Sequence, residues 1–354
     1  MTTRERMLRM FDRKEADRVP IIDHPWPSTI ARWKREGLPE DMAWEDYLGT
    51  DKHISLMADI SPRYPEKTIE ETEEYRIYTT KYGVTMKQWK HAASTPQYFD
   101  YTVKDADTWR KAKERMVPSD DRIDWEWLKT HYKRCREEGQ WIQAYLWFGF
   151  DATQSGMVGT EETLMAIAED PEWIMDTFDH MLTTALTLTD RMWDAGYTVD
   201  SIMWTDDLGY KDRTFFSLDT YRQILKPYHQ RAIDWAHKKG IKTILHSCGN
   251  INSYIPDLID MGLECFNPIE VKAGMNPEQM KKDYGDKLVL HGGLNALLYE
   301  NETKEPFFEE IKRLVPIMKE NGGYIFGTDH SVPDSVSLED YRQVVKLAKD
   351  YGSF

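Results

Sequence analysis

The sequence predicts one (β/α)8 barrel with an elaborated N-terminal cap segment. From residue 141 onward, short apolar runs of strand length alternate with longer segments that carry apolar residues at helical spacing. The chain has 354 residues, which suits one large α/β barrel, and no linker-like composition divides it. Because strands separated by helices pair in parallel through right-handed crossovers, we expect residues 1–354 to form a single barrel domain.

The N-terminal half begins with a predicted helix at residues 2–13, which a threonine and a glutamate open as a capping box. Residues 19–23 follow as a first buried strand. A long and mostly polar segment, residues 32–116, contains a hairpin pattern around Tyr82 and Gly83. We expect this segment to cap the barrel mouth.

The second part of the chain alternates strands and helices. Strands are expected at residues 141–147, 201–205, 242–245, 265–269, 288–290 and 324–327. Helices, each followed by a glycine that can stop it, are expected at residues 174–192, 218–239, 251–261 and 306–321. With residues 19–23 the predicted strands number seven, so we expect a hidden eighth strand in the N-terminal half.

Composition narrows the class of protein. The chain carries 46 basic and 61 acidic residues, a formal net charge of -15, and such a surface repels nucleic acid and anionic membranes. Cys135, Cys248 and Cys265 are an odd number of thiols in a large chain, which favours a reducing compartment over a disulfide framework. The N-terminus has no apolar run of signal length, and no stretch of eighteen apolar residues occurs. We expect a cytoplasmic protein that binds neither membrane nor nucleic acid.

Three potential metal ligands follow two successive predicted strands. His246 and Cys248 come after the strand at residues 242–245, and Glu270 comes after the strand at residues 265–269. An imidazole nitrogen, a thiolate and a carboxylate can fill three positions of a tetrahedral zinc site. Because strand ends on one rim carry the chemistry of (β/α)8 enzymes, we predict a catalytic zinc ion. The alternative is that the histidine and the cysteine are packing residues.

Six runs of residues carry a resemblance to a known superfamily. They are Asp206-Asp207-Leu208-Gly209, residues 221–228, Leu245-His246-Ser247-Cys248-Gly249-Asn250, Asn267-Pro268-Ile269-Glu270, His291-Gly292-Gly293-Leu294-Asn295 and Gly322-Gly323-Tyr324-Ile325-Phe326. Together they resemble the uroporphyrinogen decarboxylase superfamily, in particular its branch of corrinoid-dependent methyltransferases, from about residue 143 to the end. This resemblance implies a methyltransferase that works with a small-molecule methyl donor and with a corrinoid (cobalamin) carried by a partner protein.

The metal ligands fit a second resemblance. His246, Cys248 and Glu270 match, in order and spacing, three zinc ligands of cobalamin-independent methionine synthase, a related barrel. In both relatives the fourth ligand is a cysteine at the last strand end. That position falls near Asp329 and His330 in this sequence, so the fourth ligand is one of these residues, water or substrate.

The loss of the second thiolate has a chemical consequence. Each thiolate adds electron density to zinc, so a site with Cys248 as its only thiolate predicts a stronger Lewis acid. Sites that hold a thiol on zinc as a nucleophile suit an electron-rich metal instead. We therefore expect zinc to polarise the oxygen of a small O-methyl donor, such as a methoxylated aromatic, while reduced corrinoid takes the methyl group.

Further candidate residues end or follow strands. Of Asp206 and Asp207, one is expected to cap a turn, and the other, with a slight preference for Asp206, to orient a ligand histidine or protonate a leaving oxygen. His291 is a metal ligand, a proton donor or a core histidine. Five aromatic residues form an apolar wall for an aromatic ring, unless each simply packs in the core: Trp26, Trp147, Phe148, Phe150 and Trp204.

Three other functions stay open at this stage. The same barrel can transfer methyl in the reverse direction, from a corrinoid protein to a thiol or to tetrahydrofolate. It can also be a non-catalytic subunit that docks a corrinoid protein. Tetrapyrrole decarboxylation is disfavoured, because that enzyme grips its carboxylates with arginines after the first strand, whereas residues 24–28 here precede Arg32 and contain no arginine.

Overall fold

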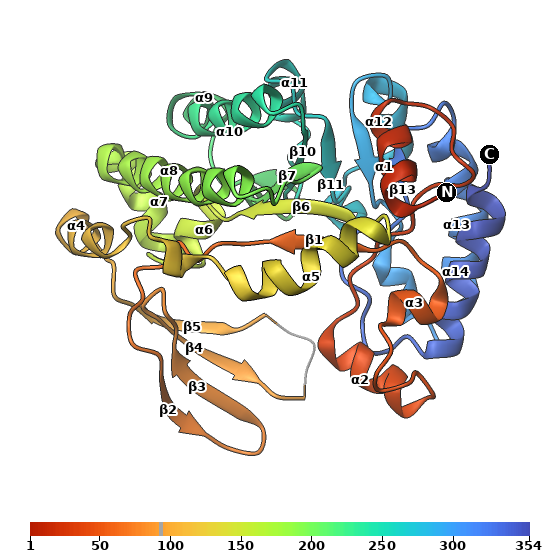
Figure 1. Cartoon of the computed structure of the whole chain (residues 1–354), viewed down its shortest axis with the longest axis horizontal. Coiled ribbons are helices and arrows are strands. Elements are labelled where there is room, and N and C mark those ends of the chain that lie inside the picture. The colour runs from red at the N-terminus through yellow and green to blue at the C-terminus, as the bar shows by residue number, and fades with distance from the viewer. Residues whose placement is uncertain (92–94) are drawn as a thin grey trace.

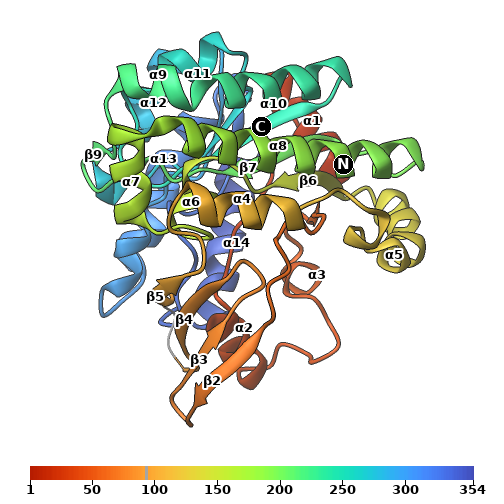
Figure 2. The same ribbon diagram turned by 90° about the vertical axis from the view of Figure 1, so that its left-hand side faces the viewer.

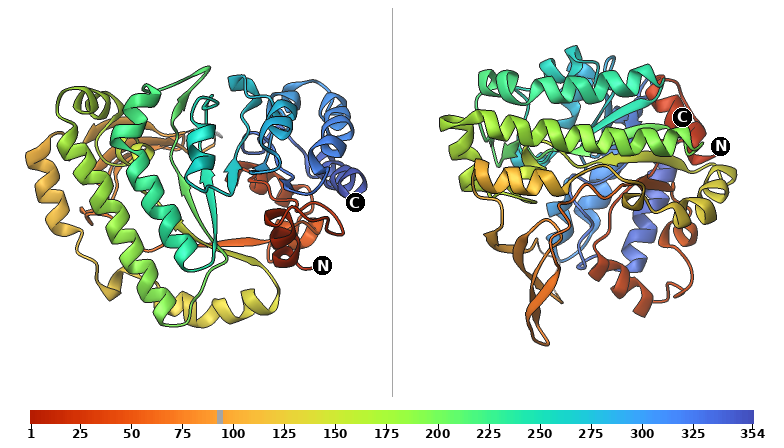
Figure 3. Two further views of the ribbon diagram at one scale, coloured as in Figure 1. Left: turned by 90° about the horizontal axis from the view of Figure 1, so that it is seen from above. Right: turned by 60° about the vertical axis from the view of Figure 1, so that its left-hand side comes forward.

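A parallel sheet of seven strands forms the centre of the computed structural model, which describes residues 1–91 and 95–354. Its strand order is β1-β6-β7-β10-β11-β12-β13. The strands are β1 (His53–Leu56), β6 (Trp141–Leu146), β7 (Ser201–Thr205), β10 (Lys242–His246), β11 (Cys265–Asn267), β12 (Val289–His291) and β13 (Tyr324–Ile325). The sheet is curled, and helices form a layer outside it (Figure 1, Figure 3). The predicted α/β barrel architecture is thereby confirmed.

Residues 19–23 connect the two edges of this sheet. On one side, Ile22 N–H donates to the carbonyl of Phe326, beyond β13, at 3.0 Å. On the other side, Asp51 N–H, just before β1, donates to the carbonyl of Ile21 at 3.1 Å. The predicted first strand is thus an extended segment held by an isolated bridge rather than a regular strand, and it occupies the position between β13 and β1.

The expected eighth strand is β1, and it lies inside the range predicted to be cap. It pairs in parallel with β6, with His53 opposite Trp141 and Leu56 opposite Ala144. Only its last residue is buried, so it lacks the apolar run that marks the other barrel strands. Residues 32–116 therefore contribute a barrel strand in addition to cap elements.

A separate antiparallel sheet projects beside the barrel (Figure 1, Figure 2). Its strands are β2 (Lys67–Glu71), β3 (Tyr75–Thr79), β4 (Val84–Trp89) and β5 (Gln97–Tyr101). β3 and β4 form the predicted hairpin. The ring of Tyr82 in its turn packs edge-on against Trp147, which follows β6, with centroids 5.0 Å apart. This contact brings the small sheet to the C-terminal end of β6; residues 92–94 of the predicted cap lie outside the described part of the chain.

The helices largely follow the predicted pattern, with one interruption. The predicted helix at residues 218–239 is divided into α9 (Leu218–Ile224) and α10 (Lys226–Lys238). Pro227 stands in the first turn of α10, where its missing N–H costs nothing, but it cannot continue the hydrogen bonds of α9. The expected capping box is present before the first helix.

The remaining elements complete the layer around the sheet and the cap. They are α1 (Thr3–Phe11), α2 (Pro27–Arg35), α3 (Trp44–Leu48), α4 (Ala106–Arg115), α5 (Trp125–Glu137), α6 (Phe150–Gln154), α7 (Thr160–Glu169), α8 (Pro171–Asp194), β8 (Gly209–Tyr210), β9 (Arg213–Thr214), α11 (Ile255–Asp260), α12 (Pro277–Tyr284), α13 (Glu305–Lys319), α14 (Leu338–Gly352) and 3-10 turns at Asp120–Arg122, Val271–Ala273 and Ala296–Glu300. Among the described residues, the search for a helix with the length and apolarity to span a membrane finds none.

Candidate metal centre

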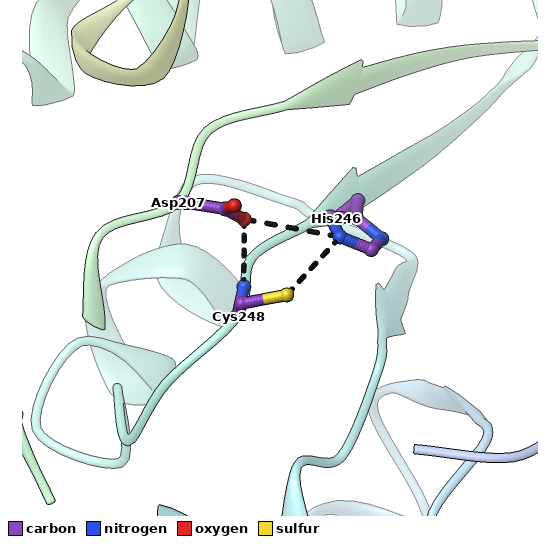
Figure 4. A group of neighbouring side chains, drawn as sticks. All are labelled: Asp207, His246 and Cys248. Atoms are coloured by element: carbon purple, nitrogen blue, oxygen red, sulfur yellow. Dashed lines mark hydrogen bonds and ion pairs between the residues drawn. The ribbon is translucent and has the colours of Figure 1, made fainter. Parts of the chain in front are cut away.

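Asp207, His246 and Cys248 meet at the C-terminal ends of two neighbouring strands (Figure 4). β7 and β10 pair with Thr205 opposite His246, so the residues that follow these strands lie side by side. One potential ligand atom from each of the three residues lies within 4.8 Å of the others. His246 Nε2 is 3.5 Å from Cys248 Sγ and 3.8 Å from Asp207 Oδ1. The structure thus adds Asp207, predicted as a catalytic candidate, to two of the predicted ligands.

Asn267 fixes the orientation of the His246 ring. Its Oδ1, at the end of β11, lies 2.7 Å from His246 Nδ1. Because an amide oxygen can only accept, Nδ1 carries the proton and Nε2 keeps its lone pair toward Cys248. Histidines that bind metals commonly have their second ring nitrogen held in this way. Asn267 belongs to one of the family-like runs, but the sequence did not identify this role.

Two glycines allow the loops after β7 and β10 to touch. A Cβ added to Gly249, whose φ is +79°, would lie 2.3 Å from the carbonyl carbon of Gly209, and a Cβ on Gly209 would lie 2.6 Å from Gly249. Gly209 N–H donates to Cys248 O at 3.1 Å, and Cys248 N–H donates to Asp207 Oδ1 at 2.8 Å. This close approach sets the position of Asp207 relative to Cys248.

The charge balance of the site fits a cation. Burial, followed by the charges of Asp207 and Glu270, raises the pKa of the Cys248 thiol well above its usual value. A divalent metal ion would reverse this effect, because it stabilises a thiolate and compensates nearby carboxylates. Imidazole, thiol and carboxylate donors together suit zinc.

Glu270 lies beside Asp207, His246 and Cys248, but its carboxylate contacts Gly249 and Lys272. Its Oε2 accepts the N–H of Gly249, and its Oε1 lies 3.2 Å from Lys272 Nζ. The side chain is buried, with 9% of its surface exposed. Its carboxylate therefore supports the loop that carries Cys248, and it does not join the group whose ligand atoms lie within 4.8 Å of one another.

Asp329 and His330 follow β13, where a fourth ligand was expected. Asp329 is fully buried, and its two carboxylate oxygens accept the N–H groups of Val271 at 3.0 Å and Ala296 at 2.8 Å. Burial raises its pKa. The ring of His330, an exposed residue, lies 6.2 Å from that of Trp26. Asp329 thus ties together three loops at the rim, while His330 stays open to solvent.

Asp206 faces away from the group formed by Asp207, His246 and Cys248, called the metal group below, and into the wall of the barrel. Its Oδ2 lies 2.8 Å from His229 Nε2, and its Oδ1 accepts Asp151 N–H at 2.7 Å. His229 Nδ1 lies 3.1 Å from the hydroxyl of Tyr221, and Asp206, His229 and Tyr221 have no exposed surface. This geometry does not support the slight preference for Asp206 over Asp207. A lone histidine inside a predicted helix gave no signal that could have identified His229.

Asp151 is a further carboxyl group in this region that sequence reasoning missed. Burial, together with the charges of Asp207 and Asp206, raises its pKa to about 7. Its oxygens accept hydrogen bonds from Trp147 Nε1 at 3.2 Å and from Ser155 Oγ at 3.1 Å. Asp151 can therefore hold or release a proton near neutral pH close to Asp207.

The five predicted wall aromatics have different environments. Trp26 lines a pocket beside the metal group. Trp147 is half-buried between Tyr82 and Asp151. The other three are fully buried core residues: Phe148, Phe150 and Trp204. These three residues therefore pack in the core, which was the alternative to a role in the wall of the pocket.

A pocket of about 140 Å³ opens beside the metal group. Its walls are formed by Ile22, Asp23, His24, Trp26, His246, Cys248, Asn267, Pro268, His291, Thr328, Asp329, His330 and Ser331. His291 Nε2 donates to Ile22 O at 3.1 Å, and the rings of His24 and His53 pack at right angles with centroids 5.4 Å apart. Burial within the mouth lowers the pKa of His24 to about 4 and those of His53 and His291 to about 3. Sequence reasoning selected only His291 of these three residues.

The fold and the donors at its strand ends define a barrel protein with a group of side chains that could hold a metal ion. The family described as uroporphyrinogen decarboxylase (URO-D) matches residues 152–351, more than half of the chain. The chain belongs to this family, as the sequence runs indicated.

Three curated relatives match parts of the chain. The methylcobamide:CoM methyltransferase MtaA of Methanosarcina barkeri is 24% identical over 209 residues, 55% of this chain and 56% of its own. The methylated-thiol–coenzyme M methyltransferase of Methanosarcina mazei is 25% identical over 39% of this chain and 35% of its own. The uroporphyrinogen decarboxylase of Helicobacter pylori is 32% identical over 41% of this chain and 38% of its own. The chain thus spans about half or less of these relatives.

A solved structure matches the whole chain. It is a methyltransferase from Methanosarcina mazei, with a TM-score of 0.68 and 17% identity, and the match covers 99% of both chains. At this level of identity the likeness shows a shared fold.

Proposed function

We propose that this protein is a zinc-dependent methyltransferase that transfers a methyl group from a small O-methyl compound to a separate corrinoid protein. The observation that carries the proposal is the group formed by Asp207, His246 and Cys248 at the ends of β7 and β10. The names of two relatives, which act on methylcobamides or methylated thiols, support the reaction class. We place the corrinoid on a partner protein for the same reason.

His246 and Cys248 are the proposed zinc ligands common to the sequence pattern and the geometry. Bound zinc would act as a Lewis acid on the oxygen of the methyl donor. Asn267 would hold His246 in the tautomer that leaves Nε2 free. The third ligand is a carboxylate: Glu270 has the position implied by the related barrels, whereas Asp207 has the closer ligand atom.

The choice of an oxygen rather than a sulfur substrate rests on the donor set. Cys248 is the only thiol in the group, which favours a more electron-poor metal than a site with two thiolates. The leaving phenolate or alkoxide must gain a proton. Asp151, whose pKa is raised to about 7, is the residue near Asp207 best suited to store that proton.

Methyl transfer from a corrinoid protein to a thiol is the second candidate function. Two relatives are named for transfer to coenzyme M, a thiol, which favours this direction. X-ray absorption at the zinc edge distinguishes methyl transfer to a thiol from methyl transfer out of an O-methyl compound. A thiol acceptor should replace a light-atom ligand of zinc by sulfur, whereas a methoxy compound should not.

Decarboxylation of a tetrapyrrole is less favoured. Arg32, the first arginine after residues 19–23, lies in an ion pair with Glu36 at 2.6 Å and donates to the carbonyl of Asp334 at 2.7 Å. It therefore has other partners on the outer side of α2. In this strongly acidic chain, a substrate with many carboxylates would lack an arginine clamp at this loop.

The test is a reconstituted assay. Zinc-loaded protein, reduced corrinoid carrier and a panel of methoxylated aromatics should yield methylcobalamin, which its absorption spectrum identifies. Methylation from none of the panel, with zinc bound, would contradict the proposed donor class. Methyl release from methylated carrier to thiols in the same preparation would support the second candidate instead.

The variants Asp207→Asn and Glu270→Gln identify the third ligand. Each keeps the size of the side chain and removes its charge, so the ligand carboxylate is the one whose amide variant loses zinc affinity. Equal zinc affinity in both variants and in the unmodified protein would mean that neither carboxylate binds the metal.

A further inference from the structure

His24 forms a wall of the pocket that the metal group does not use, and His53 packs against His24. His24 follows residues 19–23, and His53 begins β1, the neighbouring barrel strand. Their rings meet edge to face with centroids 5.4 Å apart. Because His24 lines the same pocket as His246 and Cys248, a molecule bound beside the metal group would meet His24, whose ring contacts that of His53.

The ring nitrogens of both histidines are available to a ligand. His246 already has Asn267 as its partner, and His291 donates to a backbone carbonyl. Within residues 1–91 and 95–354, by contrast, His24 and His53 make no ring hydrogen bond to protein. His24 lies deep in the mouth, where the surrounding protein desolvates its ring, yet part of its surface stays open to the pocket. Polar groups in such a recess are ordinarily satisfied by what binds there.

These rings are uncharged at neutral pH. Burial within the mouth is the main reason that the pKa values of His24 and His53 lie at about 4 and about 3; His246 lowers that of His24 further, and His24 and His291 lower that of His53. Two acids line the pocket: Asp23, whose carboxylate accepts hydrogen bonds from Thr328 at 2.6 Å and Tyr341 at 3.2 Å, and Asp329, whose carboxylate accepts backbone N–H groups. A neutral imidazole offers one donor and one acceptor, which matches a hydroxyl or an ether oxygen.

Apart from the proposed zinc ion, whose two charges the Cys248 thiolate and one carboxylate would balance, the pocket offers no positive charge to receive an anion. Its described lining residues include neither lysine nor arginine. Lys272 lies nearby, but its ammonium group is 3.2 Å from the Glu270 carboxylate. Sulfonates and carboxylates are normally held by arginine or lysine, and an unpaired buried charge is costly. The net charge of -15 further opposes anion entry.

We infer that His24 and His53 are specificity residues that bind the polar end of the small-molecule substrate, and that this substrate is an uncharged alcohol, phenol or ether of at most one ring. The size limit follows from the pocket of about 140 Å³, since a cavity of roughly 150 Å³ holds a benzene molecule. The inference rests on the proposed function in one respect: this pocket is taken to be the place where the methyl donor binds.

A matched pair of probes tests this inference. Isothermal titration of the zinc-loaded full chain compares 3-methoxybenzyl alcohol with 3-methoxybenzoate, which differ mainly in charge. The alcohol should bind more tightly. His24→Leu and His53→Leu should each weaken alcohol binding by about tenfold, roughly the worth of one hydrogen bond, whereas His24→Gln should retain much of it. His53→Lys should shift the preference toward the benzoate.

The control is His131→Leu, on the exposed side of α5, which should bind both probes as the unmodified protein does. Circular dichroism and zinc content identify any variant that fails to fold, and His24→Gln then carries the comparison. The inference is overturned if the unmodified protein binds the benzoate as tightly as the alcohol or binds neither, or if both leucine variants bind unchanged. Because no corrinoid is used, its failure is separate from that of the proposed function: alcohol binding without methyl transfer contradicts only the latter.

Discussion

Cys248 is the residue on which metal affinity should depend most. It is the only soft donor in the group with Asp207 and His246, and zinc is a borderline-soft ion. Cys248→Ala should therefore lower zinc affinity by more than the roughly 10–100-fold typical of losing an outer hydrogen-bond partner. Metal analysis after chelator competition measures this loss. Cys135→Ala, in α5, is the control; full zinc occupancy in Cys248→Ala would place the metal elsewhere.

Asn267 is expected to matter without touching the metal. Its Oδ1 fixes the His246 tautomer at 2.7 Å, so Asn267→Ala should let the ring rotate and weaken zinc binding by about 10–100-fold. Chelator competition again provides the measurement. Asn250→Ala is the control. It removes a side chain from the loop after β10 that carries Cys248, where Asn250 donates to Ala273 O, and it should retain zinc. Equal losses in both variants would indicate general loosening of the loop instead.

Residue identity alone could predict donors but not their partners. His246 and Cys248 were predictable because they directly follow an apolar run and carry metal-binding atoms. The backbone partners of the carboxylates were not predictable: Glu270 and Asp329 have suitable positions in sequence for metal ligands, and they also accept backbone N–H groups at these strand ends. Which backbone group a carboxylate meets depends on loops from other strands, and a single segment carries no information about that.

At the scale of elements, buried strands were predictable and half-buried ones were not. β6 and β10 are apolar runs with mostly buried residues, and both were predicted. β1 has one buried residue of four, so it lacks the apolar run that marks a buried strand. The break between α9 and α10 was missed although Pro227 marks it, since apolar spacing continues across the proline.

The contact between the loops after β7 and β10 leads to an element-scale prediction. Gly249→Ala places a Cβ 2.3 Å from the Gly209 backbone, which must move. Overpacking of this kind costs about 1–3 kcal/mol, and the left-handed φ adds roughly 1 kcal/mol. Because the moved loop carries Cys248, zinc affinity should fall together with the free energy of unfolding. Denaturant titration and chelator competition measure the two quantities.

Gly240→Ala separates backbone strain from the contact. Gly240 has a similar φ of +70°, but no atom lies within 4 Å of its added Cβ. This variant should lose only the smaller amount of stability and should bind zinc normally. If Gly249→Ala behaved in the same way, the close approach of the two loops would not be what positions Cys248.

At the scale of the whole molecule, the rim that carries the site was predictable, but the residues that surround the site were not. In a parallel barrel all strand ends meet at one rim, so residues after strands 201–205 and 242–245 had to be neighbours. Whether Asp206 or Asp207 faces the mouth depends on the path of the chain after β7. His24 and His53 follow different segments of the N-terminal part of the chain, and closure of the barrel by residues 19–23 brings their rings together.

These mouth histidines should make stability depend on pH. In the folded protein His24, His53 and His291 have pKa values of about 4, 3 and 3, below the ordinary value of 6.5, chiefly because they are buried. Between the folded pKa values and the ordinary value of 6.5, the unfolded chain binds protons that the folded chain does not. The contribution of these three histidines to stability is therefore lost as the pH falls below about 6.5. Asp23 and Asp151, with pKa values raised to about 6 and about 7, act in the opposite direction, because the folded protein binds their protons first.

Comparing a histidine variant with the unmodified protein separates the histidine contribution to the pH dependence of stability from that of the carboxyl groups, because both proteins contain the carboxyl groups. The double variant His24→Gln/His53→Gln removes two of the three groups, so its urea midpoint should fall less than that of the unmodified protein when the pH is lowered from 7 to 5. His131→Gln, on the exposed side of α5 and away from the mouth, should behave like the unmodified protein. If the double variant lost as much stability over this range as the unmodified protein, the rings of His24 and His53 would have to be protonated in the folded state. A protonated pair would also give the pocket the positive charge that its other described lining residues do not supply, and an anionic substrate would then fit it better than a neutral one.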